Sequence, residues 1–417
     1  MLTREENELL TRTGPGTPMG RLMRRYWIPA LPCDRLPEPD CAPVRVKLMG
    51  ERLVAFRDTK GRVGLLDERC PHRTASLFFG RNEECGLRCV YHGWKFDIDG
   101  NCVDQPSEPA GSTFKDKVKQ TAYPCLERGG LVWTYMGPPG HKPDFPEIEW
   151  TQVPASHRYV TRHVQDCNWL QAFEGGFDVS HLAFLHRGTA GARGFHKGGQ
   201  GVYPMPSRYE VIPAEFGFLA GSAQEAEDGM VWSANVMFMP FHKLISVSPL
   251  GAHAWVPVDD ETTMNYSIEY WPDRPLSDAE MTRSRDGDFI HPKLLPGSDR
   301  AVQNRDNDYM IDRALQKSGG SYTGIWGLGT HDCGIQESMG LVADRTIEHL
   351  GVGDTVIVNL RRFLLSALKA FEAGGRPPGL DAASYRVRSG RKLVPKGTRF
   401  ADAAPDIVRI AAPAFAK

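Results

Sequence analysis

The chain has 417 residues, of which 24% are charged and 41% are hydrophobic, and its formal net charge is −1. This length is too great for one small domain and suits two or more. The composition is that of an ordinary globular protein. The balanced charge argues against nucleic-acid binding, which usually shows a basic excess. No segment reaches the roughly 18 apolar residues of a membrane-spanning helix, so we expect no membrane partner.

The N-terminal sequence and the cysteines indicate the cellular compartment. The segment MLTREENELLTRTG lacks the apolar core of a signal peptide. Nine cysteines are present, and two of them are assigned to a metal centre below. We expect the others to be free thiols in a reducing cytoplasm.

The first part of the chain has the pattern of a small β domain. Residues 44–66 predict a hairpin, residues 94–98 alternate in polarity as a half-buried strand does, and residues 130–136 predict a further strand. The Pro-rich segment 138–154 is the expected boundary. We therefore predict an all-β domain over residues 1–150, with its core at about 40–140.

Two short motifs in this domain each combine a cysteine with a histidine. They are Cys70-Pro71-His72 and Cys89-Val90-Tyr91-His92. Two thiolates on one iron and two imidazoles on the other hold a Rieske [2Fe–2S] cluster, an electron carrier with a potential of roughly −150 to +300 mV. A structural zinc site also accepts Cys2His2, but a zinc finger normally keeps its cysteines in one pair and its histidines in the other. The mixed pairs favour the Rieske cluster.

Beyond the Pro-rich segment the chain changes to longer, mixed elements. Strands are predicted at 229–239, 243–248 and 262–271. Residues 272–308 are polar and predict a loop-and-helix excursion. Residues 354–372 have apolar side chains at helical spacing and predict a helix. We predict an α+β domain over residues 151–417.

One segment of this second domain combines an acid with two histidines. If residues 168–186 are helical, Asp178 and His181 lie three residues apart on one face, and His186 follows five residues later. Two histidines and a carboxylate form the facial triad that holds non-haem Fe(II) and leaves positions open for O2 and substrate. Such a histidine pair is by itself more often an ordinary surface or core pair. A Rieske cluster needs an electron acceptor, however, and this favours a mononuclear iron site.

The two motifs together resemble those of the oxygenase (α) subunits of Rieske non-haem iron oxygenases. The segment NWLQAFEGGFDVSHLAFLH, with the later GIQESMG and DRTIEHL, is most similar to the phthalate-dioxygenase type. The resemblance implies an α+β protein in which an all-β Rieske domain precedes a catalytic domain of the helix-grip type, an antiparallel sheet covered by helices. It also implies an oxidoreductase that uses O2 as co-substrate in the catabolism of aromatic compounds.

The resemblance further implies a set of iron ligands. His181 and His186 match the two ligand histidines, and Asp332 is the best match for the third ligand. Asp344 and Glu337 lie nearby and are alternatives for that third position.

Asp178 has a different implied role. It matches an aspartate that is not a ligand but connects a ligand histidine with a Rieske histidine of the neighbouring subunit. Such a connection implies a ring of subunits, because a head-to-tail contact closes into a ring. We expect a homotrimer or a pair of stacked trimers.

The electron donor is expected to be a separate protein. The sequence has no nucleotide-binding fingerprint, so NAD(P)H and flavin are assigned to a separate protein. The resemblance implies that this protein is a reductase with flavin and an iron–sulfur centre. Basic residues around the cluster motifs could form its docking surface, with an ordinary solvated face as the alternative. They are Arg69, Arg73, Arg81, Arg88 and Lys95.

The implied substrate is an aromatic carboxylate, which requires a cation in an otherwise apolar pocket because burying an unpaired charge is costly. Arg208 is the candidate for a bidentate clamp, with Lys243 or His242 as a second contact. Phthalate enzymes tend to have Ser-Ser before the first ligand histidine, and this chain has Val179-Ser180 instead. The expected function is O2-dependent hydroxylation of an aromatic carboxylate, by ring cis-dihydroxylation as in phthalate enzymes. O-demethylation of a methoxylated aromatic acid is the alternative, and electron transfer without oxygenase activity, a function of another class, is the remote one.

Overall fold

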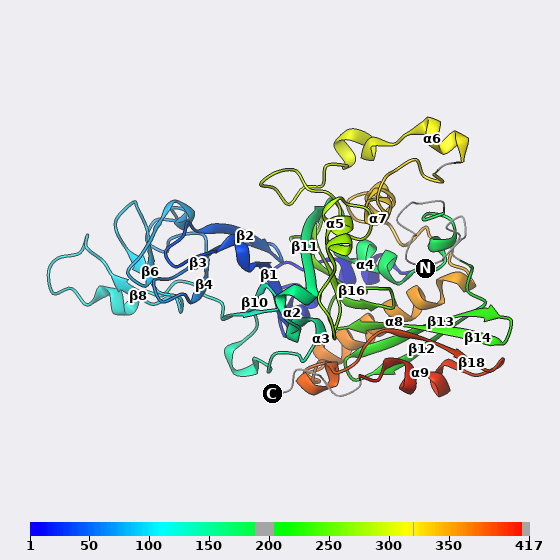
Figure 1. Ribbon diagram of the computed structural model, residues 1–417. Helices are drawn as coiled ribbons and strands as arrows, with labels where there is room; N and C mark the ends of the chain where they lie inside the picture. The colour runs from blue at the N-terminus through cyan, green and yellow to red at the C-terminus, as the bar shows by residue number, and fades with distance from the viewer. Residues whose placement is uncertain (188–203, 320, 411–417) are drawn as a thin grey trace. The chain divides into compact units, whose positions relative to one another are not determined.

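The computed structural model describes residues 1–187, 204–319 and 321–410 (Figure 1). No helix in these ranges is long and apolar enough to cross a membrane. All nine cysteines lie in these ranges, and no disulfide joins any of them.

The chain forms two compact units. The first, here called the β unit, comprises Arg24–Pro143 with Gly14–Gly16. The second, the α+β unit, comprises Asp144–Lys417 with Met1–Thr13 and Thr17–Met23. The N-terminal segment therefore belongs mostly to the unit that follows the β unit in sequence.

Two N-terminal helices account for this arrangement. α1 (Arg4–Thr11) begins with a capping box at Thr3, and α2 (Pro18–Met23) follows it. Both helices contact α8 (Thr355–Glu372). Their buried apolar side chains are Leu10, Met19, Leu22 and Met23. The predicted boundaries, 1–150 and 151–417, group this segment with the β domain, whereas the structure groups it with the α+β unit because its apolar side chains pack there.

The β unit contains three small antiparallel sheets. Their strands, in order of pairing, are β1 (Trp27–Pro32), β10 (Leu131–Tyr135) and β9 (Cys125–Arg128); β2 (Val44–Leu48), β3 (Glu51–Arg57) and β4 (Val63–Asp67); and β5 (Arg81–Glu83), β6 (Gly86–Arg88), β7 (Lys95–Phe96) and β8 (Cys102–Asp104). The predicted hairpin at 44–66 is present as β3 and β4, with β2 on the other edge of β3. The predicted strand at 94–98 is shorter, because the chain turns at Gly93 and Gly100, both with positive φ.

An apolar core connects β2–β4 with β5–β8. Phe56, Leu66, Trp94 and Phe96 belong to it, together with Cys70 and Cys89. These two cysteines are 1% and 2% exposed, respectively. The core therefore encloses both sulfur atoms of the predicted cluster site.

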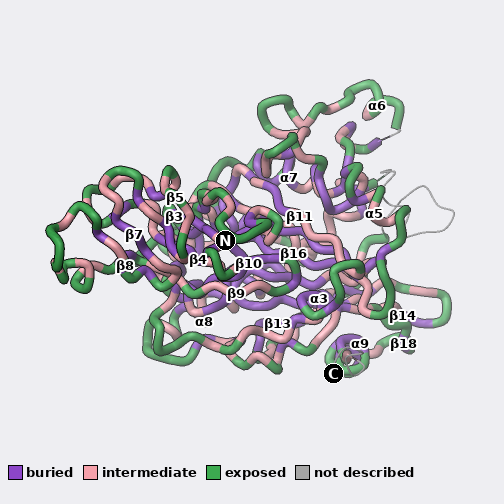
Figure 2. The backbone as a smooth tube through the Cα atoms, turned by 60° about the vertical axis from the view of Figure 1, so that its left-hand side comes forward, coloured by how far each residue is buried: buried purple, intermediate pink, exposed green. Residues whose placement is uncertain are grey.

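One antiparallel sheet of eight strands forms the α+β unit. Its strands pair in the order β11 (Arg158–Gln165), β17 (Thr263–Tyr270), β16 (Leu250–Pro257), β15 (His242–Ile245), β14 (Gly229–Phe238), β13 (Gly217–Ala226) and β12 (Arg208–Ala214), and β18 (Gly390–Val394) also pairs with β14. The three strands predicted in this part of the chain correspond to β14, β15 and β17. Figure 2 shows that the central strands are largely buried.

Helices cover both faces of this sheet. α9 (Phe400–Val408) lies beside β18 (Figure 1) and packs on one face, where the Trp232 and Phe400 rings are 5.2 Å apart. α8 packs on the other face, where the Phe218 and Phe363 rings are 5.8 Å apart. Alternate residues of each strand therefore point to different helices.

The remaining α-helices are all shorter than α8. They are α3 (Glu149–Gln152), α4 (Trp169–Phe177), α5 (Asp278–Arg285), α6 (Arg313–Ser318) and α7 (Leu328–Ser338). α4 contacts α7, α8 and β16, so it lies on the face covered by α8. α5 is the helix of the excursion predicted at 272–308. The predicted fold class, an all-β domain followed by an antiparallel sheet covered by helices, is confirmed.

A buried cluster of charges connects α4 with α8. Glu174 of α4 accepts hydrogen bonds from Arg345 at 2.8 Å and from Arg361 of α8 at 2.6 Å. Arg345 also donates to Asn7 of α1 at 3.0 Å. Burial raises the pKa of the Glu174 carboxyl, but the two arginines outweigh burial and hold the pKa below its ordinary value. Removing one partner of a buried ion pair lowers the stability strongly, because the other charge is left buried and unpaired.

We expect Glu174→Gln to destabilise the α+β unit by about 3–5 kcal/mol, because the buried Arg345 guanidinium loses its carboxylate and Arg361 keeps only that of Glu348. The free energy of unfolding in urea measures this. Asp402→Asn is the matched control, since its ion pair with Arg399 is exposed and should contribute little to stability. Equal losses in the two variants would show that the buried cluster is not a special stabilising element.

Candidate metal centres

Both cysteine–histidine motifs of the β unit lie on loops with the same turn. In each loop the residue four positions after the cysteine donates its backbone N–H to the cysteine carbonyl oxygen. Thr74 donates to Cys70 at 2.8 Å, and Gly93 donates to Cys89 at 2.9 Å. Thr74 and Gly93 both have positive φ, 58° and 78°. The two motifs, unequal in sequence, thus have equivalent backbone turns.

The four side chains of these motifs lie together. The Cys89 thiol is close enough to Cys70 to raise the pKa of the Cys70 thiol, and the His72 and His92 rings are 4.4 Å apart. Nδ1 of His72 is buried and has no hydrogen-bond partner within the described ranges, while its ring stacks on Trp94 at 4.3 Å. Burial raises the pKa of the Cys70 thiol to about 11, so iron binding must displace a proton. This donor set fits a [2Fe–2S] cluster.

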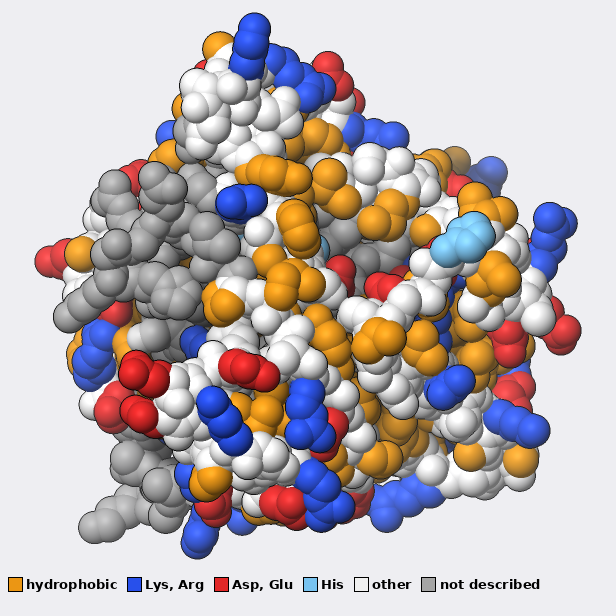
Figure 3. Space-filling view, turned by 90° about the vertical axis from the view of Figure 1, so that its right-hand side faces the viewer, with side chains coloured by type: hydrophobic (Ala, Val, Ile, Leu, Met, Phe, Trp, Pro, Cys, Tyr) orange, Lys and Arg blue, Asp and Glu red, His pale blue; other side chains and the backbone are white. Residues whose placement is uncertain are grey.

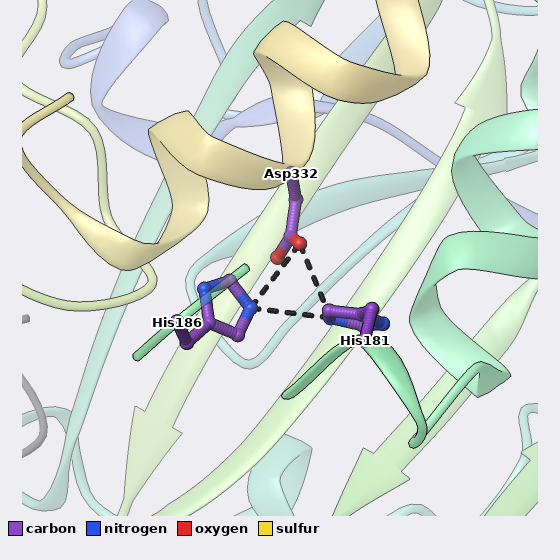
Figure 4. Close-up of side chains that lie close together, drawn as sticks. All are labelled: His181, His186 and Asp332. Carbon is purple, nitrogen blue, oxygen red and sulfur yellow. Dashed lines mark hydrogen bonds and ion pairs between the residues drawn. The ribbon is translucent and has the colours of Figure 1, made fainter. Parts of the chain in front are cut away.

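A second group of potential ligands lies in the α+β unit. His181 of the 3₁₀ helix η6 (His181–Ala183), His186 and Asp332 of α7 point toward one another (Figure 4). The Nε2 atoms of the two histidines are 3.1 Å apart. Oδ1 of Asp332 lies 3.4 Å from His181 Nε2 and 3.3 Å from His186 Nε2. These three ligand atoms lie within 4.8 Å of one another, a fit for one divalent metal ion.

The two alternatives for the third ligand are engaged elsewhere. Asp344 accepts hydrogen bonds from the backbone and hydroxyl of Thr346. Glu337 accepts a hydrogen bond from the Tyr309 hydroxyl at 2.6 Å. The structure thus brings Asp332, and neither alternative, to the two histidines.

The charges of this group suit a divalent cation. Burial would raise the pKa of Asp332, but His186 and His181 hold it far below its ordinary value. Burial lowers the pKa of His181, but Asp178 and Asp332 outweigh burial and raise it to about 9. A positive charge is therefore favoured at this point. Two neutral imidazoles and one carboxylate around a metal ion are the donor set of non-haem Fe(II) sites.

Asp178 lies beside this group, but not as a helical residue. The predicted helix over 168–186 ends at Phe177, and Asp178 caps it. The Asp178 carboxylate accepts backbone N–H bonds from Ser180 at 2.8 Å and His181 at 3.4 Å. Its other oxygen lies 3.6 Å from His181 Nδ1. Local bonds of this kind compete with helical ones, which explains why the helix does not continue.

A cavity of ≈ 160 Å³ opens beside the three potential ligands. Much of its wall is apolar and includes Leu182, Val247, Trp255, Phe289, Ile290 and Leu328. Polar side chains from four strands, β14 to β17, also line it, namely Asn235, Lys243, His253 and Asn265. The sequence analysis did not identify Asn235, His253 or Asn265 as cavity residues. Only the pairing of the strands shows that they lie on the same face of the sheet as Lys243.

Lys243 is the predicted substrate contact that reaches this cavity. Its side chain is buried, and Nζ donates a hydrogen bond to the carbonyl oxygen of Gly176. Burial lowers the pKa of Lys243 to about 8, and Asp332 and Asp178 oppose that decrease. His242, the neighbouring residue of the strand, points away from the cavity wall, and burial lowers its pKa to about 3.

Arg208, the predicted clamp, lies on the other face of the sheet. Ser222 and Gln224 of β13 line the cavity, so the intervening Ala223 faces away. Arg208 lies directly opposite Ala223 and shares its face. Its guanidinium sits over the Trp232 ring at 6.0 Å and also pairs with Glu210. The geometry does not support Arg208 as a carboxylate clamp.

Several basic residues of the predicted docking surface already form ion pairs within the β unit. Arg81 and Arg88 both pair with Glu83, and Lys95 pairs with Glu84. Arg88 further donates a hydrogen bond to the carbonyl oxygen of Gly93 at 2.7 Å. Three of the five basic residues therefore have partners within the β unit, and Arg88 holds the second cluster loop.

Fold and sites together define a class: an oxygenase component in which a β domain for an iron–sulfur cluster accompanies a helix-covered sheet with a two-histidine, one-carboxylate site. The profile of the Rieske [2Fe-2S] domain matches residues 26–122. The profile named "LigXa C-terminal domain like" matches residues 229–411.

Relatives along the whole chain identify the family. The chain is 40% identical to the 3-chlorobenzoate-3,4-dioxygenase oxygenase subunit of Comamonas testosteroni, covering 95% of this chain and 96% of that one. It is 38% identical to the phthalate 4,5-dioxygenase oxygenase subunit of Pseudomonas putida, covering 96% and 94%. The chain therefore belongs to the Rieske non-haem iron oxygenases, as an oxygenase subunit similar to those of phthalate and chlorobenzoate dioxygenases. The predicted family and enzyme class are confirmed.

Solved structures share the fold. Dicamba monooxygenase bound to dicamba aligns with a TM-score of 0.58 and 19% identity, covering 84% of this chain and 98% of that one. NdmA of Pseudomonas putida CBB5 with caffeine aligns with a TM-score of 0.60 and 21% identity, covering 87% and 94%. At these identities the likeness concerns the fold.

We expect Asp178→Asn to retain both metals but to lower turnover about 10–100-fold, because His181 loses a charged partner that orients its ring. Iron content per chain and the rate of Rieske-cluster oxidation in a single turnover measure this. Ser180→Ala is the control, because this variant retains the backbone N–H of residue 180, which donates a hydrogen bond to the Asp178 carboxylate. Near-normal turnover of Asp178→Asn would contradict a role for the carboxylate.

Proposed function

We propose that this chain is the oxygenase component of a system that activates O2 and hydroxylates an aromatic carboxylate, in the manner of ring cis-dihydroxylation. The observation that carries this proposal is the group of His181, His186 and Asp332 beside a cavity with a buried lysine in its wall. Two relatives of near-full length are named for phthalate and chlorobenzoate, both aromatic carboxylates, and they support the substrate class.

Two metal sites are proposed for this activity. Cys70, His72, Cys89 and His92 would hold the Rieske cluster, and His181, His186 and Asp332 would hold mononuclear Fe(II). When bound, the cluster supplies single electrons and the mononuclear iron binds and activates O2. The protein's own part is to orient the imidazoles and to surround the reacting atoms with a largely apolar wall.

Lys243 is proposed to bind the substrate carboxylate. An ammonium group that faces an apolar cavity can form a charge-assisted hydrogen bond with an anion. The aromatic ring would then lie against Trp255, Phe289 and the aliphatic side chains of the wall. Arg208 has no such position and is not part of the proposed site.

O-demethylation of a methoxylated aromatic acid is the second candidate. The 5,5'-dehydrodivanillate O-demethylase oxygenase subunit of a Sphingobium strain is 32% identical, covering 91% of this chain and 84% of that one. Both reactions need the same metal sites and the same cavity. A diol, or formaldehyde with a phenol, separates them as products.

Assembly into a trimer, or a pair of stacked trimers, is also proposed. Asp178 would then connect His181 with a Rieske histidine of the neighbouring subunit. The segment 310–352, which contains Asp332, exposes several large hydrophobic side chains, among them Ile335, Met339, Ile347 and Val352. Figure 3 shows one face of the molecule on which hydrophobic side chains gather around the centre. Exposed apolar surface of this kind is typical of protein contacts.

The proposed electron donor is a flavin and iron–sulfur reductase that uses NAD(P)H. Several relatives are named as subunits or components of larger oxygenase systems, which supports a separate donor. Arg69 and Arg73, near the cluster loops, are the two predicted docking residues for which no ion pair is seen in the β unit as described. The cytoplasm, a reducing compartment, is the proposed location, since no disulfide joins the nine cysteines.

Metal and sulfide analysis tests the proposal directly. Anaerobically purified protein should contain about three irons and two sulfides per chain, because both centres are then filled. The dithionite-reduced protein should give a Rieske EPR signal, and aromatic acids should stimulate O2 uptake with a reductase. Two irons without a mononuclear site would indicate an electron carrier, and zinc in place of the cluster would refute the proposal.

We expect Lys243→Met to raise KM for aromatic acids about 10–100-fold and to leave KM for the matching amides unchanged, because a hydrogen bond to a charged group contributes about 1.5–3 kcal/mol. In the unmodified protein, Lys243 is charged below a pKa of about 8. KM for acids should therefore rise as the pH increases through this value. Arg208→Ala is the control and should have no effect. Equal losses for acids and amides would refute the contact.

A further inference from the structure

His186, one of the proposed iron ligands, has a second imidazole on its outer side. Its Nδ1 lies 3.2 Å from Nδ1 of His331, and the two rings are nearly parallel at 18° with centroids 5.4 Å apart. On the far side of His331, Nε2 lies 2.8 Å from the carbonyl oxygen of Ile325 and 3.1 Å from the hydroxyl of Thr323. Both imidazoles are 0% exposed. The sequence marked His331 only as the residue before Asp332.

The carbonyl group at the end of this row fixes the direction of its hydrogen bonds. A carbonyl oxygen can only accept, so Nε2 of His331 must carry the proton. In the neutral ring Nδ1 of His331 is then an acceptor, and it can accept the proton on Nδ1 of His186. That leaves the lone pair of His186 on Nε2, the atom that faces Asp332 and His181 at 3.3 and 3.1 Å. The hydrogen bonds from His331 to Ile325 and from His186 to His331 thus both favour the His186 tautomer with the proton on Nδ1, whose Nε2 can bind a metal ion.

The two proposed ligand histidines therefore have unlike outer partners. Nδ1 of His181 faces the carboxylate of Asp178 at 3.6 Å, whereas Nδ1 of His186 faces a neutral ring. Ligand histidines usually donate to a carboxylate, a backbone carbonyl or water. With Asp332 and Asp178 as the two carboxylates at this site, a neutral partner for His186 avoids a third negative charge near a divalent ion.

We infer that His331 is a positioning residue for the mononuclear metal site: it accepts the Nδ1 proton of His186 and thereby holds that ligand in its metal-binding tautomer and orientation. The inference rests on the proposed function, because it takes His186 as a metal ligand. It adds a residue that neither the sequence motif nor the three ligands alone reveal.

The test uses Co(II) as a probe of the metal-free mononuclear site in the full-length protein. The affinity for Co(II) is measured from its ligand-field absorption, independently of turnover. His331→Phe keeps an aromatic ring but removes the acceptor, and it should weaken Co(II) binding about 10–100-fold. His331→Asn should restore most of the affinity, because its Oδ1 can take the place of Nδ1. His157→Phe, which removes another imidazole–carbonyl contact, that with Trp271, is the control and should bind Co(II) normally.

A spectroscopic signature distinguishes positioning from a general loss of structure. The Co(II) protein should give two shifted, exchangeable imidazole N–H resonances, one each from His181 and His186. In the unmodified protein the His186 resonance should exchange slowly with D2O, since its acceptor is a buried ring. In the His331→Phe variant, the His186 resonance should exchange fast and the His181 resonance should be unchanged. The variant should also keep its Rieske EPR signal. Rapid exchange in the unmodified protein would overturn the inference without any variant.

The possible failures differ from one another. Unchanged Co(II) affinity and unchanged exchange in His331→Phe would mean that His331 does not hold the Nδ1 proton of His186. That result overturns the inference and leaves the proposed function intact. Absence of Co(II) binding in the unmodified protein would overturn both.

Discussion

The meeting of one carboxylate with two imidazoles is the constraint on which the α+β unit depends. Asp332 comes from α7 and the two histidines come from the segment after α4, so these helices must lie together on one face of the sheet. The three side chains are costly to bury separately, because each prefers water when it has no partner. Together the carboxylate and the two imidazoles offer one negative charge and two nitrogen lone pairs, which a metal ion can bind. The same helices leave a cavity whose floor is the sheet.

Negative and positive groups alternate around His181, His186 and Asp332. The Asp332 carboxylate lies beside the two imidazoles, Asp178 lies beside His181, and the His331 ring lies beside His186. Lys243 adds a positive charge from the sheet. A site arranged in this way can accept a divalent cation and an organic anion at once without a large excess of either charge, which is a requirement for chemistry in a low-dielectric cavity.

Much of the function could be predicted from the sequence, because most of the proposed metal ligands lie in short motifs. Cys70 and His72, or His181 and His186, are close in the chain, so their spacing alone limits where they can lie. Asp332 is remote, yet its neighbours matched a family pattern. Arg208 failed for a different reason: the side of the sheet to which it points depends on the register with β13, and a shift of one residue would reverse it. The end of α4 was missed because Asp178 forms bonds to the backbone that no helical periodicity reveals.

The placement of α1 and α2 makes the β unit an insertion in the chain of the α+β unit. The chain begins in the α+β unit, crosses into the β unit near residue 24 and returns near residue 144. A fragment that starts at the return point would therefore lack Leu10, Met19 and Leu22, whose burial removes apolar surface from water. The catalytic half of this protein is not a contiguous stretch of sequence, and it can be separated from the electron-carrying half only by joining two pieces of chain.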